Sequence, residues 1–121
     1  MFGKITIRKS DKLFREYTLK TRPHRCEHCG RQYPEGKGLE LSHFYGRRSE
    51  STRQHPENID LLCSGCHRIF HERPASYVEW KKNKMGEKEF AKLTLRANSI
   101  QKKDEKLAII YWREKLKELE K

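Results

Sequence analysis

The chain has 121 residues, of which 34% are hydrophobic and 37% are charged. A chain of this length is expected to form one compact unit, because a domain usually has about 150 residues. So polar a composition excludes a fold that is stabilised by apolar burial alone. The 28 lysines and arginines outnumber the 17 acidic residues by 11. This excess favours contact with a polyanion, with a role in solubility as the alternative.

The first predicted element is a short helix within a basic N-terminal arm, residues 1–25, which holds eight basic and two acidic side chains. Leu13 and Tyr17 lie four residues apart after Ser10, which predicts a capped helix that ends at or before Pro23. The arm lacks the apolar run of ~7–15 residues that a secretion signal needs, so we expect a cytoplasmic protein. No apolar run approaches the ~20 residues of a membrane span, so no membrane partner is expected.

The middle segment, residues 26–73, is neutral overall, with seven basic and seven acidic side chains. Alternating residues at 38–42 predict a strand, and a brief apolar run at 59–62 predicts a second strand that pairs with it. Residues 64–71 predict a helix that stops before Pro74. The rest of the segment is rich in Gly, Pro, Ser and Arg, which is typical of loops.

The last segment, residues 74–121, has thirteen basic and eight acidic side chains and predicts helices throughout. Gly86 separates the first two, and the third spans 103–121. The third helix carries one apolar stripe, formed by Ile109, Trp112, Leu116 and Leu119. Because the stripe is shorter than the ~3 heptads of a coiled coil, we expect a monomer, or a weak dimer through this C-terminal helix.

Two Cys-x-x-Cys pairs, Cys26 with Cys29 and Cys63 with Cys66, can each present two thiolates to one ion. Four thiolates form a closed tetrahedral Zn²⁺ site with Zn–S distances of ~2.3 Å. In a reducing compartment such pairs bind metal more often than they form disulfides; two disulfides or free buried thiols are the alternative. We therefore expect a structural zinc ion that stabilises the small core.

Two histidines, His67 and His71, are four residues apart on the predicted helix and so share one face, where they can bind a second metal ion. The alternative is that one of them replaces a cysteine at the zinc or only packs. His43 lies at the end of the first predicted strand. Three other histidines have no partner at metal spacing and are expected to be surface or packing residues: His24, His28 and His55.

His43, Asn58 and His67 occur in this order across the predicted strand, loop, strand and helix start. With the segments CEHCG, LSHFYGR, ENIDLLC and SGCHRIFH, within residues 26–71, the sequence resembles zinc-stabilised HNH nucleases of the His-Me finger, or ββα-metal, superfamily. DKLF (11–14), SHFYGRRSESTR (42–53) and LRANSIQKKDEKLAIIYWREKL (95–116) resemble more closely the phage recombination endonucleases of the NinG/Rap type.

This resemblance implies an α+β fold in which a small zinc-stabilised ββα-metal core, treble-clef-like and spanning 26–73, is flanked by α-helices in 1–25 and 74–121. It implies a metal-dependent DNA endonuclease of phage recombination or DNA processing, acting on duplex or branched DNA inside a bacterial cell. His43 would activate the attacking water and Asn58 would hold the His43 strand and loop. His67 and His71 would bind a catalytic Mg²⁺, Mn²⁺, Ni²⁺ or Zn²⁺.

One departure from the family concerns Ser42, which stands where many members have Asp or His as a further metal ligand. A serine hydroxyl is a poor ligand, so the ion would be held by two histidines, water and DNA phosphate, and we do not count the nearby Glu40 as a ligand. This departure leaves open a non-catalytic zinc-binding module that binds DNA or a phage assembly partner. Charge alone also leaves open an RNA partner.

The residues that are expected to contact DNA are basic. Three arginines in the loop between His43 and Asn58 are predicted to bind phosphate through paired hydrogen bonds, with a solvated loop as the alternative: Arg47, Arg48 and Arg53. Several lysines are predicted to add a sequence-independent attraction that weakens with salt: Lys81, Lys82, Lys84, Lys88 and Lys92.

Overall fold

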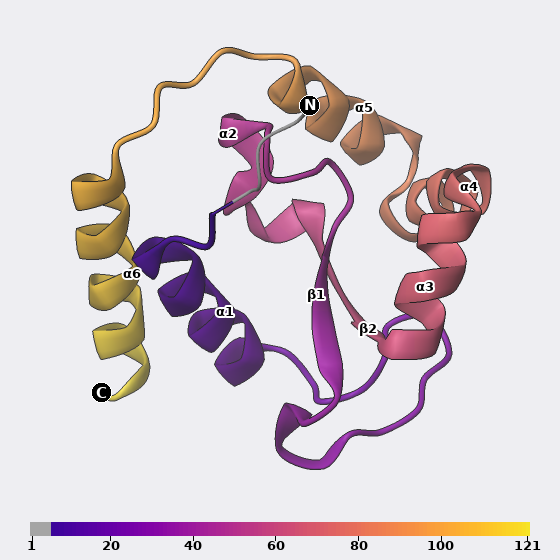
Figure 1. Cartoon of the computed structure of the whole chain (residues 1–121), viewed down its shortest axis with the longest axis horizontal. Helices are drawn as coiled ribbons and strands as arrows, with labels where there is room; N and C mark the ends of the chain where they lie inside the picture. The colour runs from indigo at the N-terminus through magenta and orange to yellow at the C-terminus, as the bar shows by residue number, and fades with distance from the viewer. Residues whose placement is uncertain (1–5) are drawn as a thin grey trace. The chain divides into compact units, whose positions relative to one another are not determined.

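A computed structural model describes residues 6–121 as a mixed α+β protein (Figure 1). In this part of the chain the α-helices are α1 (Lys9–Thr21), α2 (Glu50–Arg53), α3 (Ser64–Glu72), α4 (Pro74–Met85), α5 (Glu87–Ala97) and α6 (Glu105–Leu119). The strands are β1 (Leu39–His43) and β2 (Ile59–Cys63), and two short 3₁₀ turns are η1 (Pro34–Gly36) and η2 (Pro56–Asn58). The predicted α+β class is therefore confirmed.

The chain forms two compact units, not the single unit expected from its length. One contains α1 and α6, from opposite ends of the sequence, and the other spans residues 24–100. Charge and motifs divide the sequence into segments 1–25, 26–73 and 74–121. In the structure, α4 and α5 pack in the same unit as the cysteine segment, and α6 packs with α1. None of the described helices is both long and apolar enough to cross a bilayer.

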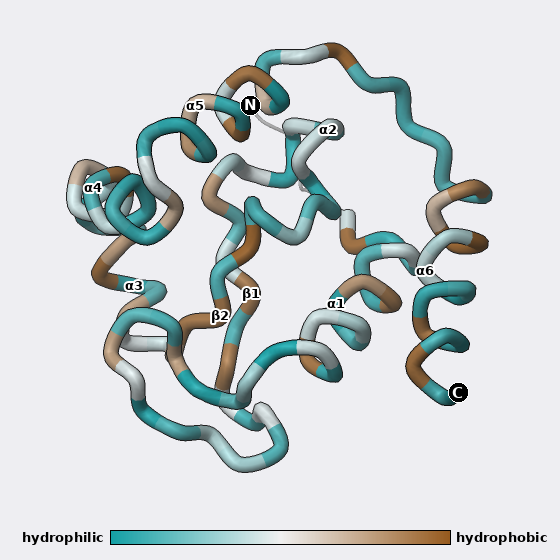
Figure 2. The backbone as a smooth tube through the Cα atoms, turned by 180° about the vertical axis from the view of Figure 1, so that it is seen from behind, coloured by the Kyte–Doolittle hydropathy of each residue, from teal (hydrophilic) through white to brown (hydrophobic). Residues whose placement is uncertain are grey.

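The α1–α6 pair is built around Trp112, which is buried against two aromatic rings of α1. Its ring centroid lies 4.8 Å from that of Phe14 and 5.3 Å from that of Tyr17. At the other end of the contact, the Ser10 backbone N–H donates to the Glu105 carboxylate at 3.2 Å. Hydrophobic bands alternate with hydrophilic ones along α6 (Figure 2), as expected of an amphipathic helix that covers one neighbour.

The sheet of the second unit is a pair of antiparallel strands. Leu39 pairs with Cys63, Leu41 with Leu61, and His43 with Ile59. All five residues of β2 are buried, which explains its nearly continuous apolar sequence, and α3 begins directly after the strand. This register places Cys63 at one end of the strand pair and His43 at the other.

The helices that follow the sheet are separated by backbone breaks. Pro74 occupies the first turn of α4, where its missing N–H costs no hydrogen bond, and Gly86 (φ +85°) separates α4 from α5. Aromatic rings fasten α3 to α4: Phe70 stacks on Tyr77 with centroids 4.6 Å apart. These breaks agree with the helix boundaries predicted from Pro74 and Gly86.

Sequence periodicity did not predict the short helix α2, because its residues are polar and few. The segment is nevertheless buried, since it packs on α5 through polar contacts. The Ser51 hydroxyl donates to the Arg96 carbonyl at 2.5 Å, and Arg96 Nε donates to the Ser51 carbonyl at 2.8 Å. These reciprocal hydrogen bonds order a stretch that its composition assigns to a loop.

Candidate metal centre and histidine cavity

The first cysteine pair lies on a tight turn that docks on the sheet. The Gly30 N–H donates to the Cys26 carbonyl at 2.9 Å, and Gly30 itself has φ +80°, a conformation that favours glycine. The Glu27 N–H donates to the Leu61 carbonyl of β2 at 2.8 Å. The turn is therefore fixed against the same strand that ends in Cys63.

The second pair joins a strand end to a helix start. Cys63 closes β2, and its sulfur accepts from the Cys66 N–H in the first turn of α3, at 3.4 Å. In the first pair, the Cys29 N–H lies 3.5 Å from the Cys26 sulfur. Each Cys-x-x-Cys spacing thus returns a backbone N–H to the preceding sulfur.

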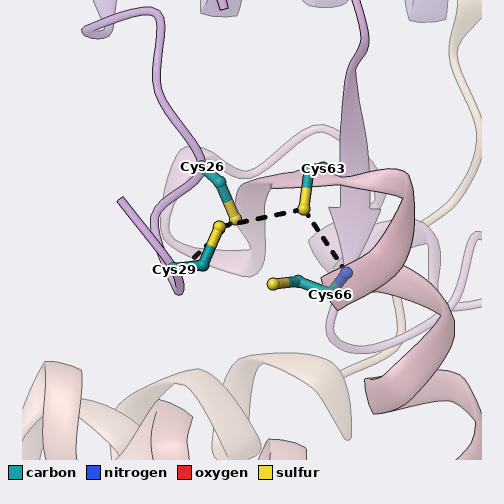
Figure 3. Close-up of side chains that lie close together, drawn as sticks. All are labelled: Cys26, Cys29, Cys63 and Cys66. Atoms are coloured by element: carbon teal, nitrogen blue, oxygen red, sulfur yellow. Dashed lines mark hydrogen bonds between the residues drawn. The ribbon is translucent and has the colours of Figure 1, made fainter. Parts of the chain in front are cut away.

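The four sulfur atoms converge. All lie within 4.8 Å of one another, and Cys29 Sγ is 3.9 Å from Cys63 Sγ (Figure 3). Tetrahedral zinc with Zn–S bonds of ~2.3 Å requires sulfurs ~3.8 Å apart, so the spacing fits such an ion. The cysteines are free of disulfide bonds. The prediction that Cys26, Cys29, Cys63 and Cys66 come together is confirmed, and the cluster can hold a structural zinc-like metal.

The acidity of these thiols differs across the second pair. Burial opposes ionisation of Cys63, but hydrogen bonds from Cys66 and neighbouring groups outweigh it and lower the pKa of Cys63 to about 6. Burial, with the sulfurs around it, raises the pKa of Cys66. Metal binding must therefore displace a proton from Cys66, which makes the affinity depend on pH.

His28, expected to be an ordinary surface or packing residue, belongs to the surroundings of the sulfur cluster. Its Nδ1 lies 3.2 Å from the Cys66 sulfur, and its ring packs against Phe70 (4.7 Å) and Trp80 (5.7 Å). Its position inside Cys-Glu-His-Cys was the signal available in the sequence. An imidazole donating to a ligand sulfur orients that ligand and withdraws charge from it.

The three histidines predicted to act at the site line one cavity. His43 at the end of β1 and His67 and His71 on α3 border a cavity of about 570 Å³, together with residues of α4 and α5. His67 and His71 also lie beside Glu40 and Arg68 in a neighbouring depression. The fold therefore brings together at one cavity three residues that lie up to 28 positions apart in the sequence.

Asn58 is fully buried and fastens the segment that follows His43. Its side-chain oxygen accepts from the Tyr45 N–H at 2.8 Å, and its amide donates to the carbonyls of Tyr45 (2.9 Å) and Thr52 (3.1 Å). Its backbone carbonyl accepts from the Phe44 N–H at 2.9 Å. These contacts hold the end of β1 and the loop after it.

Glu40 contacts one of the candidate metal ligands. Its Oε1 lies 2.6 Å from His67 Nδ1, so Nε2 is the ring nitrogen of His67 that this contact does not use. Within residues 6–121, the four cysteines are the one group of three or more potential ligands with donor atoms within 4.8 Å of one another. The histidines and Glu40 thus form no ligand group of that kind.

Ser42 is 2% exposed and points into a buried polar network. Its hydroxyl lies 2.9 Å from the Tyr77 hydroxyl, which donates to Asp60 at 2.7 Å. Lys81, a residue that is 1% exposed, places its Nζ 2.9 Å from the Asp60 carboxylate. Lys84 Nζ lies 2.7 Å from the same carboxylate. The predicted role of Lys81 in attracting DNA is wrong, because the side chain is buried in an ion pair.

The loop arginines differ in their exposure. Arg48 is exposed and Arg47 is half-buried. Arg53 is 4% exposed, and its Nη1 donates to the Arg47 carbonyl at 3.2 Å, so it does not fit the predicted phosphate contact. His24 and His55 join neither the sulfur cluster nor the cavity.

Comparisons with protein families, with curated proteins and with solved structures find no match for this chain.

Proposed function

We propose that the protein is a metal-dependent DNA endonuclease of the HNH type. The observation that carries the proposal is that His43, His67 and His71 line one cavity, on a strand and helix joined to a four-cysteine cluster. A module that only binds DNA needs no such convergence of imidazoles. In this proposal β1, β2 and α3 are the ββα-metal core, and zinc at the cysteines stabilises it.

The proposed reaction is hydrolysis of a phosphodiester. A divalent ion held by His67 and His71 supplies positive charge to the phosphate oxygens as water attacks phosphorus. His43 takes the proton of that water, a role that suits imidazole because its usual pKa of ~6.5 leaves it largely neutral at pH 7. The bond between phosphorus and the 3′ oxygen breaks as the bond to the water oxygen forms, and the 3′ oxygen takes a proton from solvent, which leaves a 5′-phosphate and a 3′-hydroxyl.

Two side chains support these roles without touching the substrate. The hydrogen bonds of Asn58 to Tyr45 and Thr52 hold the loop that follows β1. In this proposal they fix the orientation of His43 at the end of that strand. The contact between Glu40 and His67 Nδ1 favours the tautomer whose Nε2 is available to the ion. Because Ser42 is engaged with Tyr77, we assign it no ligand role.

DNA binding is proposed to rest on basic residues that are exposed or half-buried. Arg48 and Arg47 lie in the loop after His43, and three exposed lysines lie on the helices that border the cavity: Lys82, Lys88 and Lys92. Such contacts position the phosphate backbone and weaken as salt rises. The likeness to phage recombination endonucleases extends the proposal to branched DNA in a bacterial cytoplasm.

One observation favours a second candidate, a non-catalytic zinc module that binds DNA. The position of the further metal ligand in many HNH nucleases is here Ser42, buried and hydrogen-bonded. The candidate would keep the zinc, the basic surface and DNA binding, and lack hydrolysis.

The deciding experiment is a nicking assay on supercoiled plasmid with Mg²⁺, Mn²⁺, Ni²⁺ or Zn²⁺, comparing wild type with His43→Ala. We expect His43→Ala to lower the rate by about 10²–10⁴-fold, the usual contribution of a general base, with zinc content and DNA affinity kept. His24→Ala, an exposed histidine outside the cavity, is the matched control. Wild-type protein that binds DNA but never nicks it with any of these ions would favour the zinc module.

A further inference from the structure

The cavity beside the three histidines has a wall that hydrolysis does not require. Aromatic and apolar side chains of the loop after β1 and of α4 and α5 line it: Phe44, Tyr45, Tyr77, Val78 and Phe90. Phe44 meets the edges of Tyr77 and Phe90 at centroid distances of 4.9 and 5.5 Å. The volume of about 570 Å³ lies within the ~300–1,000 Å³ of sites that take small ring compounds.

One ring of this wall is reachable from outside. Phe90 is half-buried, and the ammonium group of the exposed Lys82 lies 5.4 Å from its ring centroid. Lys82 and Phe90 both line the cavity, and the ammonium group over the ring marks a face that a ligand can reach. Lys82 is an exposed side chain with a long, flexible stem. A planar ring of a ligand can therefore take its place over Phe90, while the Lys82 ammonium group moves to an adjacent phosphate.

We propose that this cavity receives one unstacked nucleobase of the strand whose backbone lies at the histidines, an inference that rests on the proposed function. Aromatic side chains bind the π-face of any base, and the basic Lys82 suits the attached phosphate. In a fully paired duplex a base reaches such a cavity only after it is unpaired and unstacked, which costs free energy that an already unpaired base does not require. The preferred substrate is therefore DNA with unpaired nucleotides next to the cut, such as bulges and gaps.

The hydroxyl groups of the cavity indicate little selection among bases. Tyr45 donates to Thr94 across 2.7 Å, and Thr94 donates to the Phe90 carbonyl. Because the single proton of Tyr77 goes to Asp60, the Ser42 hydroxyl donates to Tyr77. All four hydroxyl protons are thus used within the protein, so these hydroxyl groups offer no donor to a base edge, and stacking is the main contact.

The test uses zinc-loaded, full-length protein without a further divalent ion, and duplexes that carry fluorescent 2-aminopurine either unpaired in a one-nucleotide bulge or paired. We expect binding to change the fluorescence of the unpaired base, because its stacking neighbours change, and to leave that of the paired base unchanged. Phe90→Leu, which keeps an apolar side chain but removes the ring, should weaken bulge binding by about 5- to 150-fold, the range for loss of one stacked base. Tyr111→Ala, an exposed aromatic residue of α6 outside the cavity, should change nothing.

Equal affinity and equal fluorescence for bulged and paired DNA would overturn the inference, and this comparison needs only the wild-type protein. Unchanged bulge binding by Phe90→Leu with normal zinc content would also overturn it. If neither plasmid nor bulged DNA is cut with any of the divalent ions, yet binding changes the fluorescence of the bulged base, the nuclease proposal fails while the base site stands. If fully paired DNA is cut as fast as bulged DNA and the fluorescence of the bulged base does not change, the base site fails while the nuclease proposal stands.

Discussion

The two compact units are stabilised by different means. In the α1–α6 pair, Trp112 packs against Phe14 and Tyr17, and burial of aromatic surface holds two helices that would be marginal alone at 13 and 15 residues. Residues 24–100 contain the four-cysteine cluster and a buried carboxylate that is paired with lysines. A polar chain can therefore distribute its stability between apolar contacts and metal or ionic centres.

The largest expected effect is metal removal. A strong zinc chelator, or Cys63→Ser, should unfold residues 24–100, because structural zinc sites contribute ~10–16 kcal/mol of binding free energy in small peptides. The α1–α6 pair has no cysteine and should keep its helices. Hydrogen exchange followed by mass spectrometry separates the two units, and Ser64→Ala, at the exposed residue after Cys63, is the control. Unchanged protection of β2 and α3 after verified metal loss would contradict this.

Trp112→Ala should act on the other unit. Removing a buried tryptophan costs about 3–5 kcal/mol, enough to separate α1 from α6. We expect faster hydrogen exchange at residues 9–21 and 105–119, with zinc content unchanged. Ile110→Ala, at a residue of the same helix that is 58% exposed, should have little effect. Equal loss of protection in both units would show that they are not stabilised separately.

Lys81→Met tests the ionic part of the second unit. Breaking a buried ion pair costs about 3–5 kcal/mol, and we expect the lower end because Lys84 and Tyr77 remain on Asp60. Urea unfolding of zinc-loaded protein measures the change. Lys82→Met, at the exposed neighbouring lysine, is the matched control and should leave the midpoint unchanged. If the two variants unfold alike, the buried pair contributes no net stability.

The smallest effect concerns pH. Burial, with the nearby Arg96, lowers the pKa of His55 below its usual ~6.5. The unfolded chain then binds a proton more readily than the folded one, so this residue's contribution to stability falls as pH drops below ~6.5 and levels off below the folded pKa. The difference in unfolding free energy between wild type and His55→Gln should therefore change between pH 7 and pH 5. A difference that is constant over this range would contradict the shift.

Local patterns were enough to predict part of this structure. The Cys-x-x-Cys spacing predicted the sulfur cluster, and Pro74 and Gly86 predicted helix breaks, because each of these depends on a few neighbouring residues. The gathering of His43 and His71 at one cavity followed from strand, strand and helix order together with a family pattern.

Other features depend on contacts between distant segments. Lys81 looks like its neighbour Lys82 in a basic run, but its side chain contacts the buried Asp60 of β2, whereas that of Lys82 is exposed. A signal was nevertheless present: Asp60 is the one charged residue of a strand that is otherwise apolar, and such a carboxylate needs a basic partner. Burial of Arg53 similarly follows from the docking of α2 on α5.

Cys66 and His67 are consecutive residues of α3, yet one faces the sulfur cluster and the other the cavity. Successive side chains on an α-helix differ in direction by about 100°, so this single step supplies the whole turn between the two environments. Adding or deleting one residue here would rotate both imidazoles away from the cavity even if the cysteines still gathered. In this stretch the spacing of the chain is therefore as tightly constrained as its chemistry.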